Sequence, residues 1–169
     1  SGLPILSEEG RNIAYDERKN WQKFWLVDPL DGTKEFIKRN GEFTVNIALI
    51  EEGAPVLGVV YAPVLDILYF ACHGFGAFKL TRASGITNAS LEAYCDASVH
   101  LPLVAGDTIE RPYTIIGSRS HRSVQFESFV AEKLKLHGCA DVRSIGSSLK
   151  ICLVAEGSAD VYPRLGPTM

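Results

Sequence analysis

The first half of the chain alternates apolar and polar residues in short runs, the pattern typical of β-strands. Between residues 42 and 50, Phe43, Val45, Ile47 and Leu49 alternate with smaller or polar residues. Turn-forming glycines and prolines interrupt the pattern at regular intervals. The strands expected from it are 42–50, 56–62, 67–72 and 77–80. Such a succession with short turns predicts an antiparallel meander.

The second half changes to longer elements. A strand is expected at 113–117, a helix at about 122–136, a strand at 142–145, a helix from Ser147 or Ser148 to 155, and a strand at 159–162. The first of these helices places Phe126, Phe129, Val130 and Leu134 on one face, and Gly157 closes the second. This half is therefore read as β-α-β-α-β.

Residues 81–111 lack a period and are interpreted as a connector between two lobes, with room for a small insertion. The predicted fold class is α/β, a layered α+β sandwich with an antiparallel front lobe at 1–80 and an α/β lobe at 112–169. Residues 10–22 are polar and predict an exposed, mobile loop.

Composition and charge exclude several classes of protein. The apolar fraction of 46% is ordinary for a globular domain, and the net charge of −3 argues against a general nucleic-acid binder. No apolar stretch approaches about 18 residues, and no leader peptide is visible. The four cysteines form no CxxC pair, so zinc is not indicated and reduced thiols are expected. We expect a cytoplasmic domain.

Candidate chemistry is concentrated at residues 24–36. The apolar run 24–27 predicts a buried strand, which Asp28 ends because Pro29 has no N–H for the ladder. Gly32 then allows a tight turn. Such a turn can aim the carboxylates of Asp28 and Asp31 and the carbonyl of Leu30 at one point, and these hard oxygen ligands suit Mg²⁺.

An ordinary structural turn is the alternative, because Asp-Pro and Asp-Gly pairs are common in turns. Two carboxylates about 4 Å apart, however, repel by roughly 4 kcal/mol at an effective dielectric constant near 20. A fold that holds them together needs a cation or a raised pKa. The combination of strand, two acids and Gly-Thr favours a metal site.

The segment Asp28-Pro-Leu-Asp-Gly-Thr33 resembles the D-P-[IL]-D-G-T signature of the lithium-sensitive, Mg²⁺-dependent phosphatase superfamily. This superfamily includes inositol monophosphatases, fructose-1,6-bisphosphatases and 3′(2′),5′-bisphosphate nucleotidases. The continuation through residues 34–43 is similar to the bacterial nucleotidase branch, the CysQ type, because the inositol branch usually has Thr-Asn-Phe there. The resemblance covers nearly the whole chain and implies the inositol-monophosphatase-like fold.

The resemblance also implies roles for individual residues. Glu8, which follows a short strand beginning at Pro4, corresponds to a metal-binding Glu; alone it would read as a solvated surface charge. The implied metal ligands are Glu8, Asp28, Leu30 and Asp31, and the implied catalytic residues are Glu8, Asp28, Asp31 and Thr33. Thr33 would orient the attacking water, although a helix cap is its ordinary role.

Substrate contacts are expected on both halves. Free N–H groups at Gly32 and Thr33 could meet a phosphate at the start of a short helix. In the second half, Ser147 and Lys150 lie at the start of a helix. A cation there is unfavourable next to the positive end of the helix dipole, and a bound anion would explain its presence. The alternative is an ordinary serine cap with a solvated lysine. Arg164 could grip a second phosphate, and His121 could contact a nucleoside or be structural. The full substrate-binding set is Glu8, Leu30, Asp31, Gly32, Thr33, His121, Ser147, Lys150 and Arg164.

The resemblance implies a hydrolase that removes the 3′-phosphate of adenosine 3′,5′-bisphosphate to give AMP, in sulfur assimilation and nucleotide recycling. It implies two or three Mg²⁺ ions and inhibition by Li⁺. An inositol or sugar phosphatase of the same fold is the alternative, and a non-catalytic nucleotide-binding fragment is the alternative of another class. The expected partner is this small nucleotide, with no nucleic acid and no membrane span; some relatives attach peripherally to the inner face of the cell membrane, but the chain has no visible anchor.

Both ends predict that the chain is the middle of a longer enzyme. It begins at Ser1 without Met and stops in a Gly-Pro turn before Met169. Relatives carry a helical segment before the position of Leu3 and a Trp-Asp motif after that of Met169, and each supplies an Asp. We therefore expect the chain alone to bind metal poorly and to turn over slowly or not at all.

Overall fold

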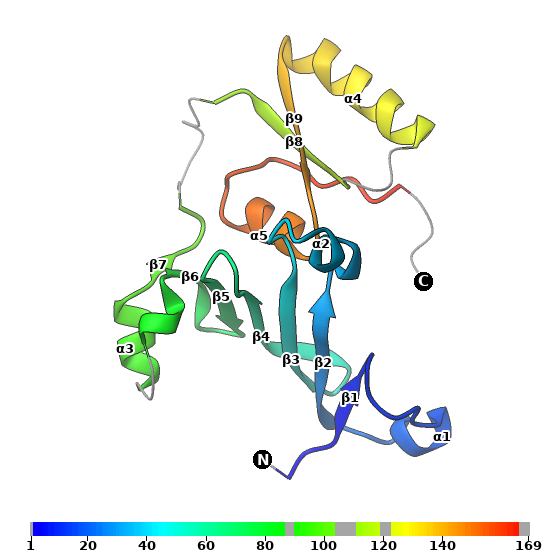
Figure 1. The fold of residues 1–169 in the computed structure, drawn as a ribbon, viewed down its shortest axis with the longest axis vertical. Coiled ribbons are helices and arrows are strands. Elements are labelled where there is room, and N and C mark those ends of the chain that lie inside the picture. The colour runs from blue at the N-terminus through cyan, green and yellow to red at the C-terminus, as the bar shows by residue number, and fades with distance from the viewer. Residues whose placement is uncertain (1, 87–89, 104–110, 119–122, 166–169) are drawn as a thin grey trace.

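The computed structural model describes residues 2–86, 90–103, 111–118 and 123–165 as an α/β protein with two sheets (Figure 1). The strands are β1 (Ile5–Ser7), β2 (Lys23–Asp31), β3 (Thr44–Glu51), β4 (Ala54–Ala62), β5 (Ile67–Cys72), β6 (Gly76–Thr81), β7 (Val99–His100), β8 (Tyr113–Ser118) and β9 (Ala140–Ile145). The helices are α1 (Tyr15–Arg18), α2 (Thr33–Lys38), α3 (Leu91–Asp96), α4 (Val124–His137) and α5 (Leu149–Ala155), with a 3-10 turn η1 (Ala83–Gly85). The predicted fold class is confirmed.

The larger sheet has seven strands in sequence order, from β1 to β7. β1 lies parallel to β2, and every later neighbour is antiparallel, so the predicted meander is confirmed. The β3–β4 turn has Glu52 and Gly53 at φ 51° and 78°. Positive φ at both central residues is the geometry of a tight two-residue hairpin turn, which matches the twist of the strands.

The sequence predicts that the strand ends at Asp28, but β2 continues to Asp31. The β2–β3 ladder pairs Asp28 with Asn46 and Asp31 with Thr44, with a register shift between the two pairs. Pro29 falls inside this irregularity. A bulge absorbs the residue that lacks an N–H, so pairing is interrupted and then resumes at Asp31.

Two other segments also differ from the prediction. The loop at 10–22 contains the one-turn helix α1, and it is largely exposed apart from Ile13. The connector at 81–111 contains α3 and β7, and β7 pairs with β6 to extend the sheet. These elements are too short to show a period in the sequence.

The second half is a parallel pair, β8 and β9, with α4 lying along it (Figure 1). A Cβ on Gly117 would lie 2.8 Å from the ring of Phe126, so glycine lets the buried Phe126 of α4 pack closely on β8. The strand predicted at 159–162 is reduced to one bridge, between Ile115 and Val161. The helix predicted at about 122–136 is α4, capped by the Ser123 hydroxyl.

A common core joins the two halves. Ala62 and Tyr69 from the large sheet pack with Leu101 and with Leu149 and Cys152 of α5. Burial raises the pKa of Cys152 to about 12, so this thiol stays protonated. In Figure 1, α5 follows β9 down to the ends of β2 and β3, next to α2. The residues that begin α5 therefore reach the turn that follows β2.

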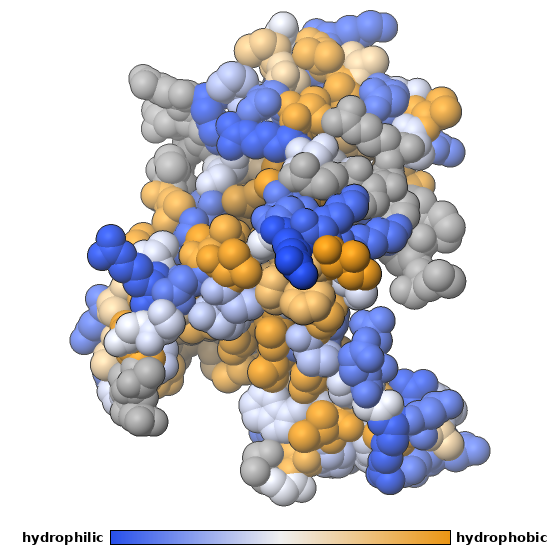
Figure 2. Space-filling model, in the orientation of Figure 1, coloured by the Kyte–Doolittle hydropathy of each residue, from blue (hydrophilic) through white to orange (hydrophobic). Residues whose placement is uncertain are grey.

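The surface is divided by polarity. Figure 2 shows hydrophilic residues around α1 and α2, with hydrophobic residues over the middle of the large sheet between them. A cavity of about 440 Å³ on this sheet is lined by residues such as Leu57, Phe70 and Leu91. None of the described helices is long and apolar enough to cross a membrane.

Asp160 is expected to contribute a pH-dependent part of the stability. Its carboxylate accepts hydrogen bonds from Arg111 Nη1 (2.6 Å) and from the Thr114 N–H (2.6 Å). Burial raises the pKa of Asp160, but the bonds from Arg111 and Thr114 outweigh burial and hold the pKa below its ordinary value. A lowered folded-state pKa stabilises the fold above the unfolded value of about 3.9, and this stabilisation is lost as the pH falls through the folded-state pKa.

We therefore predict that Asp160→Asn lowers the free energy of unfolding by about 1.5–3 kcal/mol at pH 7. Urea unfolding of both proteins at pH 7 and pH 3 measures the difference, which should shrink at the lower pH. A difference that is equal at the two pH values would contradict this account.

Candidate active site

The turn at residues 28–33 joins β2 to α2 and is shaped by the bulge at Pro29. The Leu30 N–H donates to Asp28 Oδ1 at 3.1 Å, which fixes the carboxylate against the backbone. Gly32 caps α2 with φ 93° and ψ 46°, a left-handed conformation that favours glycine. The motif therefore has a defined shape, with Asp28 and Asp31 on either side of a rigid bend.

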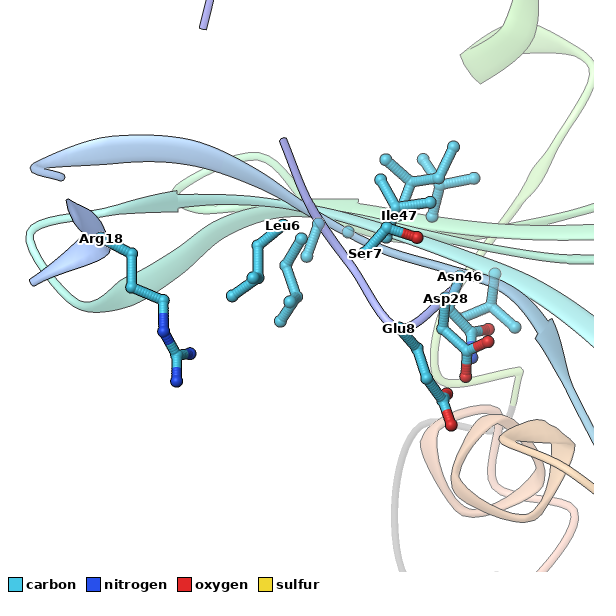
Figure 3. Close-up of a pocket in the computed structure, with 13 residues that line it drawn as sticks. Leu6, Ser7, Glu8, Arg18, Asp28, Asn46 and Ile47 are labelled. Carbon is cyan, nitrogen blue, oxygen red and sulfur yellow. The ribbon is translucent and has the colours of Figure 1, made fainter. Parts of the chain in front are cut away.

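Glu8 and Asp28 line one side of a cavity of about 530 Å³, which we call the Glu8 cavity. The parallel pairing of β1 and β2 aligns Ser7 with Val27, and the Glu8 N–H donates to the Val27 carbonyl at 3.3 Å. The residue that follows Ser7 is Glu8 and the residue that follows Val27 is Asp28, so two acids lie side by side at the ends of this pair. Figure 3 shows both carboxylates extending to the same side of the sheet, with Asn46 beside Asp28.

The environment of Asp28 disfavours its charge. Burial raises the pKa of this carboxyl, and the nearby charges of Asp31 and Glu9 raise it further, against the opposing bond from the Leu30 N–H. A partly buried acid among other acids is typical of a site that receives a cation.

Asp31 lies on the other side of the turn. Its Oδ2 accepts from the Ser148 N–H at 2.6 Å, from Asn46 Nδ2 at 3.3 Å and from Thr44 Oγ1 at 3.4 Å. Ser148 Oγ in turn donates to Asn46 Oδ1 at 2.9 Å. These contacts draw Asp31 toward the start of α5, so it does not share the Glu8 cavity. Of the three predicted acids, Glu8 and Asp28 thus line one cavity and Asp31 lines the neighbouring one, while the charge of Asp31 still acts on Asp28.

A second cavity, of about 310 Å³, gathers most of the predicted substrate contacts, and we call it the Lys150 cavity. Its lining joins residues from the turn and α2 with residues from β8, α5 and the segment after α5. They are Asp31, Gly32, Thr33, Lys34, Glu35, Ser118, Gly146, Ser147, Lys150 and Arg164. The turn at 28–33 therefore has the Glu8 cavity on one side and the Lys150 cavity on the other.

Lys150 is held inside this cavity. Its ammonium donates to the Ser147 carbonyl and lies 5.6 Å from the centre of the Tyr162 ring. Burial lowers the pKa of Lys150, the carboxylates of Asp31 and Glu35 oppose this, and Arg164 adds to the lowering. Ser147 is buried and adopts φ 49°, a left-handed conformation that costs a non-glycine residue about 1–3 kcal/mol. The carbonyl of a strained residue thus positions the cation.

Several residues of this site were not predicted from the sequence. Thr44 and Asn46 were read only as the polar side of a strand, and Ser148 only as a helix start. The signal that could have found Thr44 and Asn46 is that these two polar positions of β3 pair with Asp31 and Asp28 of β2. Glu35 was used only to distinguish branches of a family. The predicted contact His121 lies outside the described residues.

The site offers few carboxylates, a number that is compatible with Mg²⁺. Among the described residues, no group of three or more His, Cys, Asp and Glu side chains could together hold a metal ion. Mg²⁺, however, commonly binds through one or two carboxylates with water and substrate phosphate completing its shell. The Glu8–Asp28 pair supplies such carboxylates, so the residues present fit this ion.

Comparison with known proteins relates the chain to a family of phosphatases. A sequence profile described as the inositol monophosphatase family matches residues 1–169. The chain is 51% identical to the 3′(2′),5′-bisphosphate nucleotidase CysQ of Salmonella typhimurium and 48% identical to that of Escherichia coli K12, each over 166 residues. These alignments cover 98% of this chain and 58% of each relative. The chain thus spans a little over half the length of the curated relatives it matches.

Solved structures agree with this assignment. The crystal structure of CysQ from Bacteroides thetaiotaomicron, titled a bacterial member of the inositol monophosphatase family, has a TM-score of 0.89 and 48% identity, covering 100% of this chain and 62% of that chain. Mycobacterium tuberculosis SuhB has a TM-score of 0.63 and 26% identity, covering 95% of this chain and 56% of that chain. The predicted inositol-monophosphatase-like fold is confirmed.

Proposed function

Because the chain belongs to the inositol monophosphatase family, we propose that the gene product containing it is a Mg²⁺-dependent phosphomonoesterase acting on adenosine 3′,5′-bisphosphate. It releases the 3′-phosphate and leaves AMP. The observation that carries this proposal is the position of the 28–33 turn between a cavity that holds the carboxylates of Glu8 and Asp28 and one that holds the cations of Lys150 and Arg164. A substrate with two phosphates matches such a pair of cavities.

Glu8 and Asp28 in the Glu8 cavity, together with the Leu30 carbonyl and Asp31 of the adjoining turn, are the groups that would hold Mg²⁺. Two or three ions and inhibition by Li⁺ are part of this proposal. The chemistry that Mg²⁺ supplies when bound is neutralisation of phosphate charge and acidification of water. Glu8, and Thr33 from the other side of the turn, would orient the attacking water, and the rigid turn fixes the carboxylates so that little reorganisation accompanies the reaction.

The Lys150 cavity would hold the remaining phosphate and part of the nucleoside. Lys150 and Arg164 supply the positive charge, and the Ser147 hydroxyl supplies a further polar contact. A related solved structure, 27% identical with a TM-score of 0.65, is titled as a 2′AMP-bound inositol monophosphatase, which supports a nucleotide in a site of this family. His121 is kept as a proposed nucleoside contact.

Substrate choice is tested by phosphate release from adenosine 3′,5′-bisphosphate and from inositol 1-phosphate under identical Mg²⁺ conditions. We expect the nucleotide to be the better substrate by kcat/KM. Higher kcat/KM with inositol 1-phosphate would overturn the nucleotidase assignment and leave a phosphatase of the same family. No hydrolysis of either compound by the complete gene product would favour a nucleotide-binding role.

Lys150→Ala is expected to raise KM for adenosine 3′,5′-bisphosphate about 10–100-fold, the effect of losing one charged hydrogen bond to substrate. The change in kcat should be smaller, because Lys150 lies across the turn from the proposed metal ligands. Steady-state kinetics measure both constants. Lys135→Ala, at an exposed position of α4, is the matched control and should leave both unchanged. A fall in kcat with KM unchanged would contradict this role.

A further inference from the structure

Glu35 is a buried carboxylate in the Lys150 cavity that the proposed chemistry does not use. It lies in α2 two residues after Thr33, and only 6% of its surface is exposed. It lines the cavity together with Lys150 and Arg164. Acids of this kind are rarely buried unless they are paired, because loss of hydration disfavours their charge.

Two glycines make room for this side chain. A Cβ on Gly146 would overlap Glu35 Cγ, and a Cβ on Gly32 would lie 3.4 Å from Glu35 Oε2. Gly32 belongs to the turn at 28–33, and Gly146 begins the segment that leads into α5. Glu35 is therefore wedged between the two backbone segments that build the site, beside Gly32 of the turn that separates the two cavities.

The carboxylate of Glu35 has no hydrogen-bond donor among the described residues. Neighbouring Glu42 differs, because its Oε2 accepts the Gly146 N–H at 2.8 Å. Among the described residues, no buried side-chain oxygen is both sealed from solvent and without a hydrogen-bond partner. Because the oxygens of Glu35 have no such partner, they must be accessible, and the space next to this residue is the Lys150 cavity. The site thus presents an acceptor to whatever the cavity contains.

We propose that Glu35 determines specificity by accepting a hydrogen bond from the free sugar hydroxyl next to the scissile phosphate. This inference rests on the proposed function. If the 3′-phosphate lies at the Glu8 cavity and the 5′-phosphate in the Lys150 cavity, the ribose crosses the turn where Glu35 meets Gly32. The 2′-hydroxyl is the donor there. A phosphate oxygen would be repelled by the carboxylate, whereas a hydroxyl satisfies it.

The test compares adenosine 3′,5′-bisphosphate with 2′-deoxyadenosine 3′,5′-bisphosphate. A site that hydrogen-bonds a substrate hydroxyl rejects the analogue without it, and we expect kcat/KM to favour the ribonucleotide on the order of 100-fold. In Glu35→Ala this ratio should fall to a few-fold. Glu35→Gln keeps an amide oxygen that can accept, so it should retain an intermediate ratio. Glu132→Ala, at an exposed site on α4, is the control and should keep the full ratio.

Several outcomes overturn the proposal. A wild-type ratio near one does so without any variant. A Glu35→Ala protein that loses activity equally on both compounds, with the ratio retained, shows that Glu35 only supports the fold. If neither compound is hydrolysed, the proposed function fails separately, and the dissociation constants of the two compounds measured by calorimetry decide the role of Glu35. Equal dissociation constants, or no binding of either compound, then overturn it.

Discussion

Asp28→Asn is expected to lower Mg²⁺-dependent phosphate release from adenosine 3′,5′-bisphosphate on the order of 1,000-fold in the complete gene product. Asparagine has nearly the same shape and can still accept the Leu30 N–H that Asp28 accepts now. The substitution therefore removes the charge that the proposed cation needs and changes little else. Initial rates at saturating substrate measure the effect.

The same variant should not be less stable without Mg²⁺. Burial, with the charges of Asp31 and Glu9, raises the pKa of Asp28, so the fold gains from its protonated form at low pH and loses that gain as the pH rises through the folded-state pKa. At pH 7 the ionised carboxyl therefore costs stability, which asparagine relieves. Asp16→Asn, at an exposed position in α1, is the control and should change neither activity nor stability. Full activity in Asp28→Asn would remove Asp28 from the metal site.

Glu156→Gln is expected to lower the free energy of unfolding by about 3–5 kcal/mol, because it leaves a partner cation unpaired inside the protein. Glu156 is only 3% exposed, and its Oε2 accepts from Lys79 and from the Tyr69 hydroxyl at 2.8 Å. Oε1 accepts from Ser158 Oγ. This network ties the end of α5 to β5 and β6, so its loss weakens the joint between the two halves.

Urea unfolding at pH 7 measures this effect. Glu51→Gln is the matched control, because Glu51 pairs with Lys23 at the surface at 3.1 Å and both side chains are more than a third exposed. An exposed pair contributes less than about 1 kcal/mol. Equal losses in the two variants would show that the buried network carries no special weight.

The sequence predicted the strands of the large sheet because each one carries its own alternation. It could not predict the bulge at Pro29, because the way in which a strand accommodates a proline depends on the register of the partner strand, here β3. The elements between residues 81 and 111 were missed for a different reason. β7 has only Val99 and His100, too few residues for any pattern.

The part of the candidate site that lies within one short segment of the chain could be predicted from the sequence. The order of acids and glycine at 28–33, with the resemblance it carries, pointed to Asp28, Asp31 and Thr33. It could not reveal that Asp31 is held by the Ser148 N–H, 117 positions along the chain, because such a contact depends on the packing of α5 against the sheet. The same packing separates Asp31 from the Glu8 cavity and buries Glu35 between Gly32 and Gly146.

The most direct test of the central claim is the Mg²⁺ dependence of phosphate release from adenosine 3′,5′-bisphosphate. The complete gene product is depleted of metal with a chelator and then titrated with Mg²⁺. The account predicts no release without the ion, saturating release as the ion is added, and no such response in Asp28→Asn. Release that continues unchanged in the presence of the chelator would contradict it.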